Sequence, residues 1–366
     1  MSATARTARA RPPRARFAHI RARAPGSIDH TLPDRASSRR DDQVHGRART
    51  PRASADQQIA DLETPTAFED RAAAGAMAST VGPDSGAGAR TIGRYPRSRE
   101  SVYLPAMSAL EFVDLSTARA APGVRIVVSG LVPSPWSEAT KGLFRLASVP
   151  VRAVRRMRDT AEVTAWTGVD NVPVVFHDAE PARTSWVAIT ALAARLAGPD
   201  VVLPDDTAAR AETIGLLHEI AGEEGIGWNA RLAMIDATIK SGGKRGFPLP
   251  VGQYLAARYG YTPDAGEQIR PRIERQLHMV RDRLVAQQAL GRDYLGGAKP
   301  SALDIYVATF LTPLSVLSAD DCPLLEPRLR SAFSTAHEEL GALVPEELFA
   351  HRLMVLERHL GWPIAL

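Results

Sequence analysis

The stretch at residues 126–147 constrains the fold of this chain more than any other. Its first three residues are apolar, as is typical of a short buried strand, and Gly130 and Pro133 end that run. Ser134 and Pro135 follow as an N-cap and a proline at the first helical position, ahead of a helical pattern. We therefore expect a strand, a turn and a helix. A helix start carries partial positive charge and unpaired N–H donors, so this turn suits an anion or a thiolate.

Composition narrows the class of protein. The 366 residues suffice for two domains, and 45% hydrophobic content suits a packed core. No apolar run approaches the ~20 residues that a membrane-spanning helix needs. Cys322 is the single cysteine, which excludes a disulfide framework, a Cys-x-x-Cys redox pair and a cysteine-rich metal site. One unpaired thiol is typical of a reducing compartment, so we expect a cytoplasmic protein.

The positive charge belongs to residues 1–106. They hold 18 Arg and no Lys against 11 Asp and Glu, a net +7, whereas the remainder holds 27 Lys and Arg against 30 Asp and Glu, a net −3. This Arg- and Ala-rich leader is of low complexity, and we expect it to be disordered. An organelle-targeting peptide and a basic arm for nucleic acid or membrane are alternatives. We favour an extension upstream of a start at Met107, because the composition changes abruptly there.

Beyond the leader, the pattern divides into two domains. Strands and helices alternate over 107–200, a linker follows at 201–206, and every periodic segment in 207–366 is helical. The expected strands are 125–129, 149–154 and 171–176, and the expected helices of the first domain are 135–147, 160–167 and one beginning near Arg183. The expected helices of the second domain are 207–223, 226–239, 265–289, 301–317, 324–340 and 345–360.

Three further features stand in this order along the chain. Pro173 opens a strand; were the Val172–Pro173 bond cis, the backbone of Val172 would be exposed to an extended peptide-like ligand. The Thr184-Ser185 pair at a helix start suits a carboxylate, although an ordinary N-cap is the simpler interpretation. The spacing of Ser301 and Asp304 predicts a capping box that nucleates a buried helix and takes no part in chemistry.

From about Arg125 to the C-terminus, this set of features resembles the glutathione S-transferase family, in particular bacterial-type members with a serine turn. The resemblance implies an α/β thioredoxin-like domain, which binds glutathione, followed by an all-helical domain. The turn at 134–137 looks like the family's active-site turn, and 171–173 like its cis-proline segment, whose backbone pairs with the cysteinyl part of glutathione. Thr184-Ser185 matches the Glu-Ser pair that grips the γ-glutamyl end.

Two departures from the family pattern matter. Thr184 replaces the usual Glu, so the γ-glutamyl grip is weaker or differently made. The turn contains hydroxyls and neither cysteine nor tyrosine, which argues against the thiol-transfer, dehydroascorbate-reducing and tyrosine-dependent branches.

The resemblance also implies roles for residues. Ser134 is expected to donate a hydrogen bond to the glutathione sulfur, which favours the nucleophilic thiolate, and Ser137 is the alternative donor. Lys141 is expected to face solvent, with an approach to the glycine carboxylate as the alternative. Trp228 and Arg231 are candidates for the second-substrate pocket, although we favour core packing for Trp228. No metal is expected, because the histidines show no metal-ligand spacing. The expected glutathione-binding residues are Pro135, Trp136, Val172, Pro173, Thr184 and Ser185.

The function that the resemblance implies is transfer of glutathione, as co-substrate, to a small hydrophobic electrophile, typically in detoxification. A homodimer is implied as well, without membrane binding and without nucleic-acid binding through the folded part. Two alternatives stay open. One is a catalytically silent binding or assembly module, which Thr184 favours because fold does not dictate function. The other is a glutathione-dependent isomerase of the maleylacetoacetate isomerase type.

Overall fold

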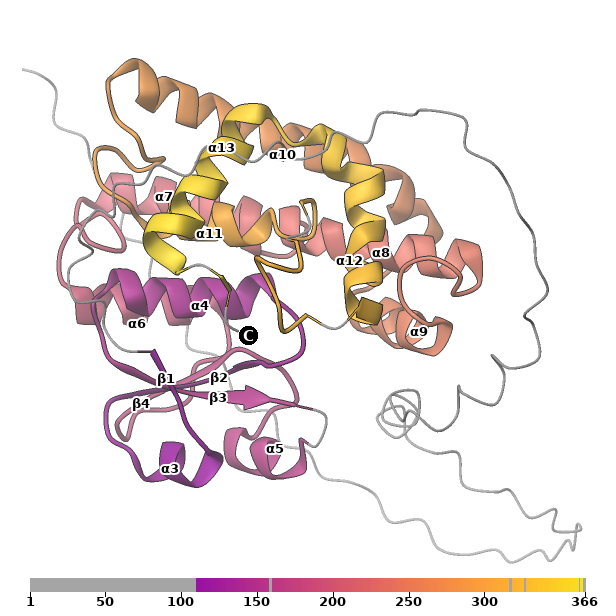
Figure 1. Ribbon diagram of the computed structural model, residues 1–366. Coiled ribbons are helices and arrows are strands. Elements are labelled where there is room, and N and C mark those ends of the chain that lie inside the picture. The colour runs from indigo at the N-terminus through magenta and orange to yellow at the C-terminus, as the bar shows by residue number, and fades with distance from the viewer. Residues whose placement is uncertain (1–109, 158–159, 316–317, 326, 362, 365–366) are drawn as a thin grey trace, which may run out of the picture. The chain divides into compact units, whose positions relative to one another are not determined.

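A computed structural model describes residues 110–157, 160–315, 318–325, 327–361 and 363–364 (Figure 1). The predictions for the leader at 1–106 and for Met107 lie outside the described residues. Everything described belongs to one compact unit. Among the described helices, none has the length and apolarity required to cross a membrane.

The sheet has four strands in the order β1-β3-β2-β4. Strand β2 is central; it pairs in parallel with β3, with Val124 opposite Val151, and antiparallel with β4, with Val127 opposite Val174. Strand β1 adds in parallel to the outer side of β3. The strands are β1 (Leu110–Phe112), β2 (Val124–Ser129), β3 (Val151–Arg156) and β4 (Val174–His177).

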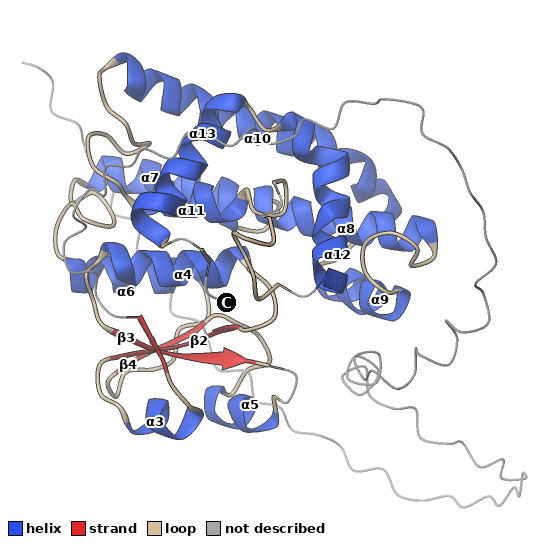
Figure 2. Cartoon of the chain, viewed as in Figure 1, coloured by secondary structure: helices blue, strands red, loops and turns tan. Residues whose placement is uncertain are grey.

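Helices cover both faces of this sheet (Figure 2). Ile126 and Val128 of β2 point to the face packed on α4 and α6, and Val127 points to the face packed on α3 and α5. A strand covered on both sides must be apolar at successive positions, which explains the unbroken apolar run in the sequence. These helices are α3 (Leu115–Ala120), α4 (Pro135–Leu146), α5 (Ala161–Thr167) and α6 (Trp186–Ala197).

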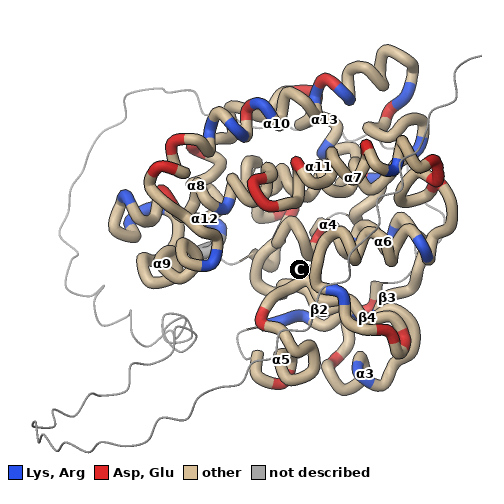
Figure 3. The backbone as a smooth tube through the Cα atoms, turned by 180° about the vertical axis from the view of Figure 1, so that it is seen from behind, with Lys and Arg blue, Asp and Glu red and all other residues tan. Residues whose placement is uncertain are grey.

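The second part of the chain is helical, as expected, and is built around α11. All nine residues of α11 are buried, and the helix packs on α4, α7 and α13. Both acidic and basic residues occur along α10 (Figure 3), while Ile269, Ile273 and Leu277 are buried, as is typical of an amphipathic helix. Its elements are α7 (Thr207–Ala221), α8 (Ile226–Ser241), α9 (Leu249–Arg258), α10 (Pro263–Ala289), α11 (Ala302–Phe310), α12 (Pro327–Leu340), η2 (Gly341–Leu343), α13 (Glu346–Val355) and the π-helical turn η3 (Leu356–Leu360).

The predicted capping box is present at the start of α11. The Ser301 backbone N–H donates to Asp304 Oδ2 at 2.8 Å, and the Ser301 hydroxyl donates to the same oxygen at 2.9 Å. The other carboxylate oxygen accepts from the Leu295 N–H at 2.8 Å and lies 3.0 Å from His351 Nε2. The box is therefore structural, and it also anchors the preceding loop and α13.

Three sequence expectations need correction. Strand β1 and helix α3, which precede the segment covered by the family resemblance, and helix α9 were not predicted. The apolar segment expected to be helical over 301–317 ends as a helix at Phe310. Lys141 does not face solvent: it is buried and pairs with the buried Glu138 at 2.8 Å. Burial raises the pKa of the Glu138 carboxyl, and the Lys141 ammonium opposes that rise.

Candidate active site

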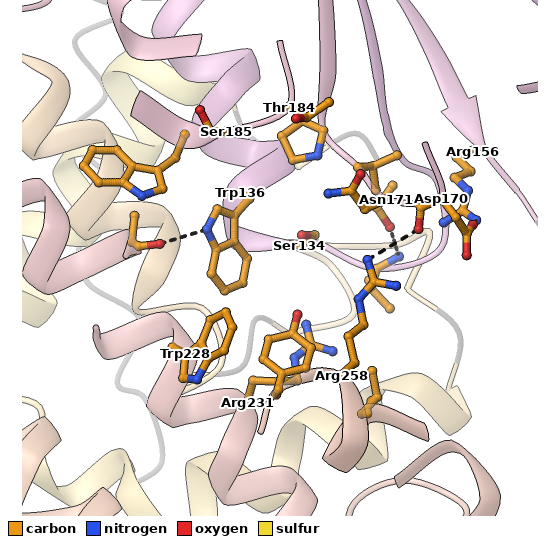
Figure 4. A pocket seen from close by; sticks show the side chains of 18 of the residues that line it. Ser134, Trp136, Arg156, Asp170, Asn171, Thr184, Ser185, Trp228, Arg231 and Arg258 are labelled. Atoms are coloured by element: carbon orange, nitrogen blue, oxygen red, sulfur yellow. Dashed lines mark hydrogen bonds and ion pairs between the residues drawn. The ribbon is translucent and has the colours of Figure 1, made fainter. Parts of the chain in front are cut away.

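A cavity of about 590 Å³ lies between the sheet domain and the helical domain (Figure 4). Three predicted segments that are far apart in sequence meet in its wall: the turn with Ser134, the Val172–Pro173 segment and the start of α6 with Thr184 and Ser185. Trp136 also lines it. The fold, and not proximity in sequence, brings these residues together.

Ser134 stands where the chain passes from the turn into α4. It is the N-cap residue, with extended backbone, but its side chain makes no capping hydrogen bond. Pro135 occupies the first turn of the helix and has no N–H to be capped. The Ser134 hydroxyl is therefore not used by its own helix and faces the cavity, beside the electropositive start of α4.

Ser137 is differently placed. Its side chain is fully buried, and its Oγ accepts a hydrogen bond from the Ser129 backbone N–H at 3.1 Å. It does not line the cavity, and neither does Pro135, which is buried. Of the two hydroxyls of the turn, only that of Ser134 faces the cavity.

Trp136 joins the turn to the helical domain. Its Nε1 donates to the Ala221 carbonyl at 3.1 Å, and its ring meets that of Phe310 edge-on, with centroids 4.9 Å apart. These contacts fix the position of the turn relative to α7 and α11. Trp136 thus both lines the cavity and connects its two walls.

The peptide bond between Val172 and Pro173 is cis. Val172 and Pro173 both line the cavity; Val172 is half-buried and Pro173 is buried. Thr184 and Ser185 are exposed at the rim, where Ser185 Oγ caps α6 by accepting from the Ala188 N–H at 3.3 Å. The N-cap interpretation of Ser185 therefore holds, and it is compatible with a place in the cavity wall.

The opposite wall comes from α8 and α9. Trp228 is half-buried; it packs on the core, as expected, and also lines the cavity, where its ring lies 4.7 Å from that of Tyr259. Arg231, one helical turn further on, lies on the same face of α8, and Tyr254 and Leu255 come from α9. In Figure 4, Ser134 lies between this wall and the rim residues Thr184 and Ser185.

Arginines give the cavity its electrostatic character. Arg156 is ion-paired with Asp170. Arg258 donates to Tyr254 Oη at 2.9 Å and to the Asp170 carbonyl at 3.5 Å, so it lies at the Asp170 and Asn171 end of the cavity (Figure 4). Arg231 lies over the rings of Phe247 and Tyr259, at 5.7 and 5.8 Å from their centroids. No cluster of metal-binding side chains occurs among the described residues.

The arrangement from β2 onward is the one that the family resemblance implies. A strand, a serine turn, a helix, a proline-led antiparallel strand and a further helix precede an all-helical part with a capping box in its central helix. The fold is that of the glutathione S-transferases. The expected fold class, a thioredoxin-like domain followed by an all-helical domain, is thus confirmed.

Solved structures similar to this chain include glutathione S-transferases. A glutathione transferase from Pseudomonas putida, with one glutathione disulfide bound per subunit, has 15% sequence identity and a TM-score of 0.44 over 68% of this chain and 96% of its own. The Tau class enzyme of mango, Mangifera indica, has 16% identity and a TM-score of 0.38 over 64% and 98%. At these values, such similarities on their own assign neither a family nor a reaction.

Sequence comparison identifies no related protein. No model of a known protein family matches the chain, and no curated protein matches it significantly.

Several cavity residues were missed by sequence reasoning. Tyr254, Arg258 and Tyr259 belong to α9 or follow it directly, and that helix was not predicted. Its first turn contains Pro250 and Gly252, which lower helix propensity, although proline in a first turn is favourable. The proline after Leu249 was the available signal for a helix start.

Proposed function

We propose that the chain is a glutathione transferase that activates the glutathione thiol with Ser134 and transfers the sulfur to an electrophile. The single observation that carries the proposal is the convergence of Ser134, Val172 and the Thr184-Ser185 pair in one cavity of about 590 Å³. Each of these groups complements a different part of an extended γ-glutamyl peptide. A cavity of that size accommodates a tripeptide and a small second substrate.

The proposed pose follows from the order of these groups. The Val172 backbone pairs with the cysteinyl unit as an added strand, and the γ-glutamyl carboxylate lies at the start of α6, beside Thr184 and Ser185. The glycine end then extends towards Asn171, where the Arg258 guanidinium lies in Figure 4. Arg258 is therefore our candidate partner for the glycine carboxylate.

The proposed chemistry needs few groups. The Ser134 hydroxyl donates to the sulfur, and the start of α4 adds positive potential in the same place, so the thiol releases its proton to solvent more readily. The thiolate then forms a C–S bond with an electrophile that rests against the wall of Trp228 and Tyr259. Ser134 forms no covalent bond.

Two serine variants test this mechanism. Ser134→Ala should remove the ultraviolet absorbance of bound thiolate and lower kcat/KM by about 10- to 100-fold, the effect of one hydrogen bond to a charged group. Ser137→Ala should retain the thiolate signal and instead lower the free energy of unfolding by about 1–3 kcal/mol, because the Ser129 N–H loses its buried acceptor. The reverse pattern would assign activation to Ser137.

The same measurements separate the alternative functions. Binding of glutathione without turnover of an activated aryl halide would favour a catalytically silent module, and turnover of a maleyl-type double bond would favour the isomerase. Absence of glutathione binding in calorimetry would contradict the transferase and the isomerase, and would leave only an assembly module that does not use glutathione.

Assembly and location complete the proposal. We propose a cytoplasmic homodimer, the assembly that the family resemblance implies. The buried thiol of Cys322, free among the described residues, is compatible with a reducing compartment. Sedimentation velocity of the purified chain would detect a dimer directly, and a single species of monomer mass would contradict it.

A further inference from the structure

The three arginines of the cavity are not equivalent. Arg156 is neutralised by Asp170, and Arg258 contacts the Asp170 carbonyl at the end of the cavity assigned above to the glycine carboxylate. Arg231 lies on the α8 wall, beside Trp228, on the side proposed for the second substrate. Its charge is therefore left for a group other than glutathione.

The surroundings of Arg231 favour an anion. The side chain is half-buried between the rings of Phe247 and Tyr259, which hold the guanidinium by cation–π contact without neutralising it. Within the described part of the chain, Arg231 forms no ion pair with any carboxylate. A guanidinium that has lost part of its water and lacks a counter-ion gains more from an anionic ligand than a fully solvated one does.

Two aromatic rings adjoin this charge. The Trp228 and Tyr259 rings pack at 4.7 Å, inclined at 55°. A planar ligand resting on them, with its reactive carbon towards Ser134, would present its far end to Arg231, because both Trp228 and Arg231 lie on one face of α8.

We propose that the second substrate is an aromatic or similarly flat electrophile that carries a carboxylate, and that Arg231 binds this carboxylate. The inference rests on the proposed glutathione transfer and narrows its substrate class. In the reaction with an aryl halide, a C–S bond forms, the C–halogen bond breaks, and halide leaves with the electron pair.

Product conjugates test the proposal without requiring turnover. Isothermal titration calorimetry would compare glutathione, S-(4-carboxy-2-nitrophenyl)glutathione and the matched amide, S-(4-carbamoyl-2-nitrophenyl)glutathione. The two conjugates share their peptide and ring and differ chiefly in one negative charge. We expect the carboxylate to bind at least about tenfold more tightly than the amide.

Variants of Arg231 then test whether this residue causes the preference for the carboxylate conjugate. Arg231→Gln should bring the two conjugates to equal affinity and leave the affinity for glutathione within about threefold, whereas Arg231→Lys, which retains the charge, should keep part of the preference. Arg292→Gln is the matched control, because Arg292 is exposed, outside the cavity, and hydrogen-bonded only to Gln287 within the described structure. Circular dichroism would verify the fold of each variant.

The outcomes are distinguishable. Equal binding of the two conjugates by the unmodified protein would overturn the inference, as would a preference that persists in a folded Arg231→Gln variant, and both leave the proposed function intact. Failure of glutathione itself to bind would overturn the proposed function, and the inference with it. If Arg231→Gln does not fold, the affinities of the carboxylate and amide conjugates for the unmodified protein and for Arg231→Lys still test the inference. Equal affinities in the unmodified protein would overturn it, and a preference for the carboxylate that is reduced in Arg231→Lys would support it.

Discussion

At the scale of single residues, Glu180 joins the turn after β4 to α6. Its carboxylate accepts from Arg195 at 2.7 and 2.8 Å, lies 2.6 Å from His177 Nδ1, and is ion-paired with Arg183. Hydrogen bonds from Arg195 first, then from His177 and Arg183, lower the pKa of Glu180 from 4.5 to about 2. Thr184 and Ser185 lie directly after this cluster, so it helps to position the rim of the cavity.

The lowered pKa of Glu180 predicts a pH dependence of stability. The ionised carboxylate stabilises the folded state above the unfolded-state pKa of about 4.5, and this stabilisation is lost as the pH falls towards about 2. The urea midpoint of Glu180→Gln should thus lie below that of the unmodified protein at pH 7, and the gap should narrow between pH 4.5 and 2. Glu357→Gln, at an exposed position with no ion pair among the described residues, is the control. A gap independent of pH would contradict the prediction.

Ser134 and Ser137 show how neighbouring residues of one type acquire different roles. Ser134 is the N-cap of α4 and Ser137 lies in its first turn, three positions on, and local sequence does not distinguish their roles. Their roles separate because the Ser129 N–H at the end of β2 needs an acceptor, which Ser137 supplies from the buried side of the helix. Ser134, one turn earlier, is left facing the cavity.

At the scale of elements, the crossing of α4 with α11 depends on a glycine. A Cβ at Gly142 would lie 2.7 Å from Ile305 Cγ2 and would also clash with Leu360. Gly142→Ala should therefore lower the free energy of unfolding by about 1–3 kcal/mol, in spite of the better helix propensity of alanine, because the two elements must move apart. Chemical denaturation measures this change.

Gly215→Ala, in the middle of α7, is the matched comparison for Gly142→Ala. A Cβ at Gly215 would meet nothing within 4 Å, so alanine there should raise the free energy of unfolding by about 0.5–1 kcal/mol. If the two substitutions changed stability in the same direction, close packing at Gly142 would not be the cause.

At the scale of the whole molecule, the cavity exists only while the two domains are joined. Trp136 bonds to the Ala221 carbonyl, and the Ala302 N–H donates to the Val202 carbonyl at 3.0 Å, which fixes the connection between the domains to the start of α11. The largest apolar cluster runs without interruption from β2 through α4 into α11. The domains therefore share one core.

A shared core predicts that the domains unfold together. Tryptophan fluorescence is weighted towards the sheet domain, which contains Trp136, Trp166 and Trp186, whereas far-ultraviolet circular dichroism is weighted towards the helical domain. The urea transitions measured by the two signals should coincide. Trp136→Phe should lower the free energy of unfolding obtained from each signal by the same amount, about 1 kcal/mol, because the hydrogen bond to the Ala221 carbonyl is lost. Two separate transitions would show that the domains are independent.

The sequence by itself determined the order of the main elements, the serine turn, the capping box of α11 and the helical second domain, because each is encoded by residues close together in the chain. Helix α9 and strand β1 were not predicted from the sequence. Helix α9 is short and contains proline and glycine, and β1 has only three residues, so neither has enough periodicity to be recognised.

Only the tertiary structure decided which side chains share the cavity. The burial of Lys141 against Glu138, the separate roles of Ser134 and Ser137, and the position of Arg231 between two rings all depend on contacts between distant segments. The helical period predicts which residues share one face of a helix, but it does not predict which other element that face packs against. The packing of α4 on α11 and of α9 beside α8 supplies that information, and with it the chemistry of the site.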